Sequence, residues 1–426
     1  MRKPLLKRDG LRSGALSLAA IETAVTKAVA SEQILDIHTH VYPPSFGALM
    51  LSGIDELLIY HYLVAEGFRY WPGDYPAFWK LPKHVQAERI WQTLFVDRSP
   101  ISEAARGVVT TLHRLGLQPR QNNLATLRAH FASQKPEAWV TRCMEIAGVR
   151  ALGMTNSPFD PAETPAWASG LRHDPRFIPA LRIDSLVLDW PTTSQLLRGR
   201  GYDTTATLTT KTANEMRRFL SDCTKRMQPA YVMISMPPTF RYPNRSLPAS
   251  IIERVLLPFC AEAGLPLALM PGVRRHVNPS LLLAGDGVGL ADLESYSQLI
   301  AAHPLNKFLL TALARENQHE LCVMARKFRN LHVFGCWWFT NIPSLIEEMT
   351  RMRIELLGWS VTLQHSDARV MEQLIYKWDH ARAVIGKVLV EKFCDLSNSG
   401  WAVTEQDIAE GVHAVFGGSF EEFMKS

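Results

Sequence analysis

The stretch Ile34-Leu35-Asp36-Ile37-His38-Thr39-His40 predicts a short buried strand that ends in two histidines. Alternate residues of a strand point to the same face, so His38 and His40 are expected to project side by side. Two imidazoles on one face are typical of a pair of metal ligands. The motif by itself leaves a second interpretation open, in which two unrelated histidines happen to end one strand.

The composition is that of a globular protein with an ample core. The chain has 426 residues, of which 47% are hydrophobic and 20% charged, enough for one large domain with an insertion or for two domains. The net charge of +5 is small and no block of Lys and Arg stands out, so nucleic-acid binding is not indicated. No apolar run approaches the roughly 20 residues of a membrane span. The six cysteines are scattered without a CxxC motif, which predicts reduced thiols in a cytoplasmic protein.

Apolar segments after residue 149 predict a parallel sheet covered by helices, because short apolar runs alternate with longer amphipathic stretches. With the first strand they make eight candidate strands, the other seven being Ala151–Thr155, Phe177–Ile183, Tyr231–Ser235, Pro266–Met270, Phe308–Ala312, His332–Gly335 and Trp359–Gln364. Apolar residues at helical spacing fill the gaps. Eight such units predict a (β/α)8 barrel. A doubly wound open sheet is the alternative, although no strand is followed by a glycine-rich nucleotide-binding loop.

On this pattern the chain divides into four parts. Residues 1–33 form a helical leader, residues 34–44 and 149–400 the barrel, residues 45–148 a mostly helical insertion after the first strand, and residues 401–426 a C-terminal helical segment. Glu22 and Lys27 interrupt the apolar stretch of the leader, which therefore predicts an amphipathic helix rather than a signal peptide. Five aromatic residues between Tyr70 and Trp79 suit a lid or a subunit interface equally well, so the sequence leaves the oligomeric state open, a homo-oligomer included.

Chemistry in a (β/α)8 barrel is placed at the carboxyl ends of the strands. Asp367 follows the eighth strand, which is the neighbour of the first when a barrel closes. With His38 and His40 it offers two nitrogens and a carboxylate, a donor set that suits one divalent metal with coordination positions left for water or substrate. The alternative role for Asp367 is a helix N-cap, because Ser366 and Asp367 precede a predicted helix.

Three arginines, Arg182, Arg275 and Arg369, also follow predicted strands. The guanidinium fork matches a carboxylate or a phosphate, so their position predicts an anionic small-molecule substrate. The alternative is that these arginines form salt bridges with acids on the rim, for which Asp184, Glu316 and Asp286 are available. We expect at least one of the arginines to be structural and two to contact the substrate.

Several segments resemble uronate (glucuronate) isomerase, a family of the amidohydrolase superfamily. The stretch Asp36–His40 is similar to the strand-one signature of the superfamily. The segments similar to the family itself are His61-Tyr62, Phe177–Arg182, Arg315 with Asn317, Gly335–Asn341 and Ser366–Arg369. The resemblance runs in order from about Ile34 to Phe393, and its most specific parts are the Trp-Trp-Phe and Asp-x-Arg sequences.

This resemblance implies a metal-dependent isomerase of carbohydrate metabolism. Such an enzyme interconverts a hexuronate aldose, such as glucuronate or galacturonate, and its ketose through an enediol. It would hold one divalent metal, zinc in most members and manganese as the alternative, on His38, His40 and Asp367. The candidates for binding the sugar acid are Arg182, Arg275, Arg369, Trp337 and Trp338.

Two segments depart from the family pattern. Met270 stands where the family has a histidine near the end of strand five, and Met233–Pro237 lacks an Asp-His pair of strand four. A thioether cannot act as a base and is a poor ligand for hard divalent metals. The catalytic candidates are therefore Asp367, Tyr62 and His276, with His61 and His365 as further histidines that could replace the missing groups.

Three functions stay open on the sequence. The first is a uronate isomerase. The second is a diverged member of the superfamily that hydrolyses or decarboxylates another carboxylated substrate, and the third is a non-catalytic paralogue that binds a sugar acid. Because strand four offers no lysine to bridge two metals, a dinuclear hydrolase is disfavoured.

Overall fold

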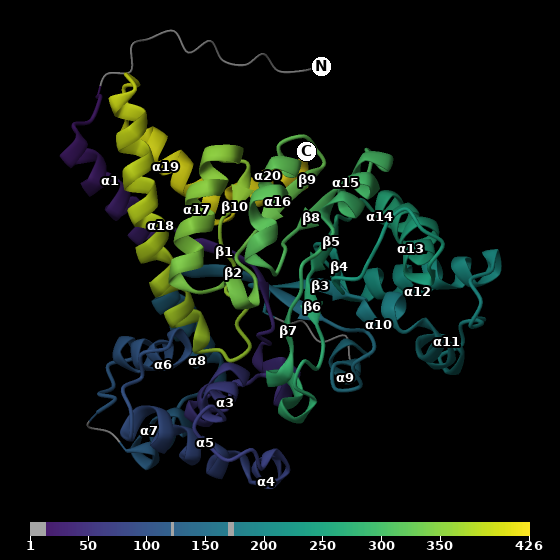
Figure 1. Ribbon diagram of the computed structural model, residues 1–426, viewed down its shortest axis with the longest axis horizontal. Helices are drawn as coiled ribbons and strands as arrows, with labels where there is room; N and C mark the ends of the chain where they lie inside the picture. Colours follow the sequence, from purple (N-terminus) through teal and green to yellow (C-terminus); the bar gives the residue numbers. More distant parts are fainter. Residues whose placement is uncertain (1–13, 121–122, 169–173) are drawn as a thin grey trace.

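The computed structural model describes residues 14–120, 123–168 and 174–426, and within them the chain forms a (β/α)8 barrel (Figure 1). Its eight parallel strands follow one another in the order β1-β2-β3-β4-β5-β8-β9-β10. They are β1 (Ile34–Thr39), β2 (Val149–Asn156), β3 (Phe177–Arg182), β4 (Val232–Met236), β5 (Leu267–Pro271), β8 (Phe308–Leu310), β9 (Leu331–Phe334) and β10 (Val361–Thr362). Each overlaps one of the eight predicted strands, so the predicted fold class is confirmed. The doubly wound alternative is wrong, because the strand order contains no reversal.

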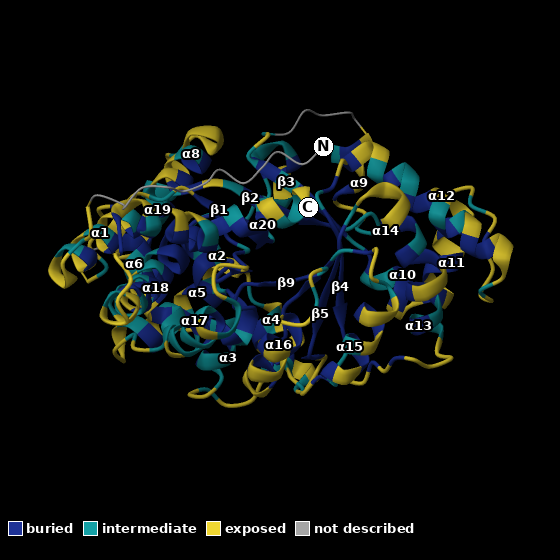
Figure 2. Ribbon diagram, turned by 90° about the horizontal axis from the view of Figure 1, so that it is seen from above, coloured by how far each residue is buried: buried dark blue, intermediate teal, exposed yellow. Residues whose placement is uncertain are grey.

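Helices surround the strands, with buried faces toward them and exposed faces outward (Figure 2). After β2 they are α9 (Thr164–Ala168), α10 (Asp184–Leu188), α11 (Trp190–Gly199), α12 (Thr210–Met227), α13 (Leu247–Ile251), η3 (Ile252–Leu256), α14 (Leu257–Ala263), α15 (Leu293–Ala302), η5 (Arg315–Asn317), α16 (Gln318–Ala325), η6 (Trp338–Thr340), α17 (Pro343–Leu357), α18 (Gln373–Asn398), α19 (Glu405–His413), η7 (Ala414–Gly418) and α20 (Ser419–Lys425). None of the helices in the described ranges is both long enough and apolar enough to cross a membrane.

The barrel closes in an unusual way between its first and last strands. The turn η7 packs against both β1 and β10, and these two strands do not pair along their length. Closure occurs at the carboxyl end of β1 and beyond the end of β10, where the His40 N–H donates to the Ala368 carbonyl at 2.7 Å and the Asp367 N–H donates to the His38 carbonyl at 3.1 Å. The main chains of His38, His40 and Asp367 therefore make the contacts that close the ring of strands.

The segment between β1 and β2 is helical and has its own apolar core. Its elements are η1 (Pro44–Leu49), α2 (Ile54–Leu58), α3 (His61–Gly67), α4 (Tyr75–Lys80), α5 (Lys83–Trp91), η2 (Gln92–Val96), α6 (Glu103–Arg114), α7 (Leu124–Ala132) and α8 (Pro136–Ala147). Buried Glu372 joins this segment to the barrel, because its Oε1 accepts hydrogen bonds from the Ser52 hydroxyl and the Trp139 indole. Ahead of β1, α1 (Leu18–Ser31) packs against α18 and α19, and residues 1–13 of the predicted leader lie outside the described residues.

A small hairpin after β5 was not predicted from the sequence. It consists of β6 (Val273–Arg274) and β7 (Gly287–Val288), joined by a segment that contains η4 (Pro279–Gly285). Strands of two residues are too short to leave a periodic signal. The Trp79 indole donates to the Ser280 carbonyl at 2.9 Å, so the hairpin spans from the barrel to the helical insertion.

Gly153 of β2 allows the close approach of β1, and we predict that Gly153→Ala destabilises the protein. A Cβ at this position would lie 2.4 Å from the Ile37 carbonyl oxygen, so the backbone of β1 would have to move. Overpacking of this kind costs about 1–3 kcal/mol, measurable as a lower midpoint of urea unfolding. The control is Gly199→Ala, where a Cβ meets no atom within 4 Å and the helix should gain slightly. Equal midpoints for the two variants would contradict the prediction.

Candidate metal and substrate site

Three potential metal ligands converge where the barrel closes. His38 and His40 lie at the carboxyl end of β1, and Asp367 lies in the segment between β10 and α18. Their candidate donor atoms all lie within 4.8 Å of one another. Asp367 Oδ1 is 3.4 Å from His38 Nε2 and 3.5 Å from His40 Nε2.

The chemistry of this cluster fits a divalent cation. Both ring nitrogens of His38 and Oδ1 of Asp367 are buried without a hydrogen-bond partner, whereas buried polar groups are almost always hydrogen-bonded. Burial lowers the pKa of His40 to about 3. Although burial raises the pKa of the Asp367 carboxyl, the two imidazoles hold it well below its usual value. Neutral imidazoles and an ionised carboxylate are the forms that bind metals.

The alternative role of Asp367 as a helix cap is wrong. The following helix, α18, begins only at Gln373, six residues later, and Asp367 itself has a positive φ of 51°. Left-handed backbone is uncommon for a residue other than glycine, and it is often found where function constrains the chain.

A narrow cavity adjoins the cluster. Its lining consists of His38, His40, Arg182, Met233, Ser235, Arg275, Trp337, Trp338, Asp367 and Arg369. The cavity thus contains the three arginines, the two tryptophans and the three metal-ligand candidates that the sequence singled out. Met270 is fully buried among apolar side chains of the barrel interior and is not part of the lining.

The three arginines differ in their partners. Arg182 pairs with Asp184 at 2.6 Å, and Arg275 pairs with Asp286 at 2.5 Å, so these two have the rim partners that we considered as an alternative. No acid or other hydrogen-bond partner of the Arg369 guanidinium is present in the described part of the chain. Arg369 is therefore the arginine best placed to receive an anionic group.

Aromatic and imidazole rings extend the site toward the helical insertion. The His61 ring lies 4.5 Å from that of Tyr62 and 5.7 Å from that of Trp338, measured between centroids. The Tyr62 hydroxyl, His61 Nε2 and the Trp338 indole nitrogen are buried without partners. Burial raises the pKa of Tyr62 well above its ordinary value and lowers that of His61 well below it. Trp338 lines the cavity, whereas the buried His61 and Tyr62 rings pack next to it without lining the cavity themselves.

Of the further histidines, His365 packs against the cluster and His276 does not. The His365 ring packs 4.9 Å from the His38 ring, is fully buried, and has no hydrogen bond on either nitrogen. His276 is exposed on the hairpin between β6 and β7. The signal for His365 is its place two residues before Asp367. After the two-residue strand β6, the chain turns away from the cavity at His276, which has a φ of 53°. So short a strand leaves no sequence pattern that would have excluded His276 from the site.

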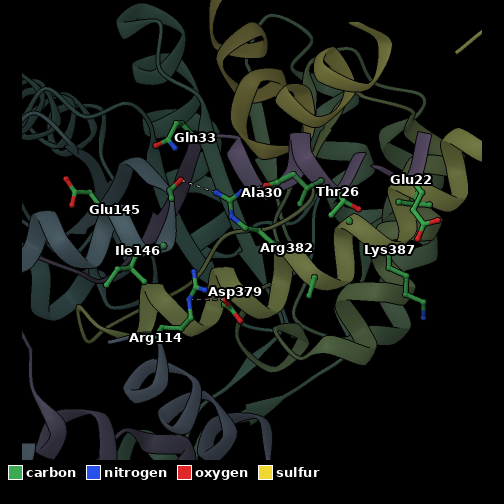
Figure 3. Close-up of a pocket in the computed structure, with 16 residues that line it drawn as sticks. Glu22, Thr26, Ala30, Gln33, Arg114, Glu145, Ile146, Asp379, Arg382 and Lys387 are labelled. Atoms are coloured by element: carbon green, nitrogen blue, oxygen red, sulfur yellow. Dashed lines mark hydrogen bonds and ion pairs between the residues drawn. The ribbon is translucent and has the colours of Figure 1, made fainter. Parts of the chain in front are cut away.

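A larger groove, of about 720 Å³, lies between α1, α8 and α18 (Figure 3). Its central Arg382 donates to the carbonyls of Glu32 and Gly148, which end α1 and α8, and its Arg114 pairs with Asp379 at 3.3 Å. These charges serve to join helices. The groove contains none of the metal-ligand candidates, so the narrow cavity is the functional candidate.

A (β/α)8 barrel with a His-x-His pair after its first strand and an aspartate after its eighth has the architecture of the amidohydrolase superfamily. Among solved structures, a uronate isomerase from Bacillus halodurans C-125 is 45% identical with a TM-score of 0.94, over 96% of this chain and 97% of that one. The chain belongs to the uronate isomerase family.

More distant structures share the fold. A uronate isomerase from Thermotoga maritima is 15% identical over 95% of this chain and 97% of that one, with a TM-score of 0.69. A glucuronate isomerase from Caulobacter crescentus is 16% identical over 99% of this chain and 97% of that one, with a TM-score of 0.68. No family model and no curated protein matches the chain.

Added metal should stabilise the protein through the His38, His40 and Asp367 cluster. Zn²⁺ at about 100 times its dissociation constant is expected to raise the free energy of unfolding by about 2.7 kcal/mol, because it binds the folded state alone. Thermal unfolding with and without Zn²⁺ measures the effect. His38→Ala and Asp367→Asn should lose it, and His276→Ala should keep it. A full shift in His38→Ala would show that the metal binds elsewhere.

Proposed function

We propose that the protein is a metal-dependent isomerase that interconverts a hexuronate aldose, such as glucuronate or galacturonate, and its ketose. One observation carries the proposal: the His38, His40 and Asp367 cluster opens onto a cavity into which Arg369 brings an unpaired guanidinium. Membership of the uronate isomerase family supports the reaction class. The arginine supports a carboxylated substrate.

In this proposal His38, His40 and Asp367 hold one divalent ion, with zinc first and manganese as the alternative. Two imidazole nitrogens and a carboxylate oxygen suit either ion. When bound, such an ion supplies a Lewis acid that polarises substrate oxygens.

The arginines would fix the acid end of the sugar. The Arg369 guanidinium can form two parallel hydrogen bonds to a carboxylate, which orients the chain of the sugar. Arg182 and Arg275 are anchored by Asp184 and Asp286, so they would contribute positive charge from fixed positions. Trp337 and Trp338 are almost fully buried in the wall of the cavity and would exclude water from it.

Isomerisation moves one proton from C2 to C1 and one proton between the two oxygens, so that atoms balance without an oxidant. We assign proton transfer to Asp367, which lines the cavity, and to Tyr62, whose buried hydroxyl has no hydrogen-bond partner. His276 lies on the exposed hairpin, so we assign its role in proton transfer to His61 instead. Burial lowers the pKa of His61, which keeps the imidazole in the neutral form that can accept a proton. An enediol requires such an acceptor within hydrogen-bond reach of the sugar.

We further infer a role in carbohydrate metabolism in the cytoplasm. All six cysteines are free thiols, and five of them are buried. Structural disulfides are rare in that compartment.

Arg369→Ala should lower kcat/KM for the hexuronate about 100-fold. Loss of a charged hydrogen-bonding partner costs about 2.7 kcal/mol, within the range typical of such groups. Ketose formation from glucuronate and galacturonate is the measurement. Arg315→Ala is the control, since Arg315 pairs with Glu348 on the rim outside the cavity and should leave the rate unchanged. Turnover by the metal-loaded wild type that does not exceed the background of His38→Ala would overturn the proposed function.

A further inference from the structure

The segment that contains Asp367 has no regular secondary structure, so contacts with other parts of the chain must hold it in place. Residues 363–368 belong to neither a helix nor a strand. Asp367 adopts a left-handed backbone with φ of 51°, a conformation that is unfavourable for a residue other than glycine and persists only where surrounding structure imposes it. The carboxylate nevertheless lies at nearly equal distances from two imidazoles, 3.4 and 3.5 Å.

One support comes from Asp36, two residues before His38 on β1. This carboxylate is fully buried. Its Oδ1 accepts a hydrogen bond from the Ser366 N–H at 3.0 Å, and its Oδ2 accepts one from the Trp378 indole at 2.8 Å. Asp36 thereby links the strand of the histidines, the residue next to Asp367, and helix α18.

A second support comes from Asn341, which follows η6. Its side-chain amide donates to the carbonyls of His365 at 3.2 Å and Ser366 at 2.9 Å, and its Oδ1 accepts from Gln364 at 2.9 Å. All of these groups are buried. Asp36 therefore binds the N–H of Ser366, while Asn341 binds the carbonyls of the same short segment.

The two supports act on a segment whose main chain is already joined to β1. The Asp367 N–H donates to the His38 carbonyl at 3.1 Å. Because Asp36 and His38 share one strand, a shift of the segment relative to Asp36 is a shift of Asp367 relative to both imidazoles. Partners behind a metal ligand that fix its orientation typically change metal affinity 10–100-fold when they are lost.

We propose that Asp36 and Asn341 are positioning residues that set the metal affinity of the site by holding Asp367 against His38 and His40. The inference rests on the proposed function for the identity of the site as a metal site. Neither side chain is among the residues that line the cavity. Both act through the backbone of His365–Asp367.

The first test is Asp36→Asn, which keeps the size of the side chain. The new NH2 group would face either the Ser366 N–H or the Trp378 indole N–H, so one of these two hydrogen bonds would be lost. We expect Zn²⁺ to bind 10–100-fold more weakly in calorimetry or in competition with a chromogenic chelator. We also expect faster amide hydrogen exchange at Ser366 in the metal-free protein. Excess Zn²⁺ should restore most of kcat.

The matched control is Glu163→Gln. Glu163 is another buried carboxylate whose oxygens accept from a main-chain N–H, that of Ser157, and from an indole, that of Trp167. It holds the main chain of the segment after β2, which carries none of the ligand candidates, and it contacts the segment after His40 only through the Tyr42 hydroxyl. We expect a comparable loss of thermal stability and a Zn²⁺ dissociation constant within twofold of wild type.

The second test is Asn341→Leu, which removes the two donors to the segment at similar volume and should weaken Zn²⁺ binding in the same range. Dissociation constants that match wild type in both Asp36→Asn and Asn341→Leu would overturn the positioning role. A wild-type protein that binds Zn²⁺ but does not isomerise hexuronates would overturn the proposed function and leave the positioning role supported by weaker Zn²⁺ binding in the variants. A wild-type protein that takes up no metal would overturn both.

Discussion

The structure depends on how the two ends of the strand ring meet. A sheet of eight strands becomes a barrel only if the first and last strands join, and here η7 occupies the space between β1 and β10. Closure is left to two main-chain hydrogen bonds at the carboxyl end of β1 and beyond the end of β10, between His40 and Ala368 and between Asp367 and His38. The residues that close the barrel are therefore the same residues that form the metal-ligand cluster.

This arrangement gathers buried polar groups without hydrogen-bond partners around the metal-ligand cluster. Buried imidazoles, a carboxylate, phenol hydroxyls and an indole lack partners around one cavity, and each such group costs about 1–3 kcal/mol when nothing satisfies it. A folded state can carry this cost because the surrounding barrel is stabilised by a large apolar core. The cost also explains why a bound cation and a polar substrate would be stabilised here, since their binding satisfies groups that folding leaves unpaired.

Much of the fold and part of the site could be predicted from the sequence. Continuous apolar runs marked all eight strands, because strands buried on both faces leave that pattern. The His-x-His spacing, with Asp367 after the last strand, identified the three clustered residues. His276 was placed wrongly, because a hairpin with strands of two residues turns it to the solvent and leaves no periodic signal. His365 was predicted only as one of several histidines that could replace the missing groups, and the structure packs its ring on that of His38.

The sequence by itself determined the barrel, the order of its strands and the residue types at their ends, because hydrophobic periodicity and strand geometry are local properties. Only the tertiary structure decided which of the arginines lacks a partner, which histidines meet, and that Asp36 and Asn341 hold the segment of Asp367. Hydrogen bonds such as that of Asp36 to Ser366 join residues more than three hundred positions apart. No local pattern records such pairings, since they exist only after the ring of strands has closed.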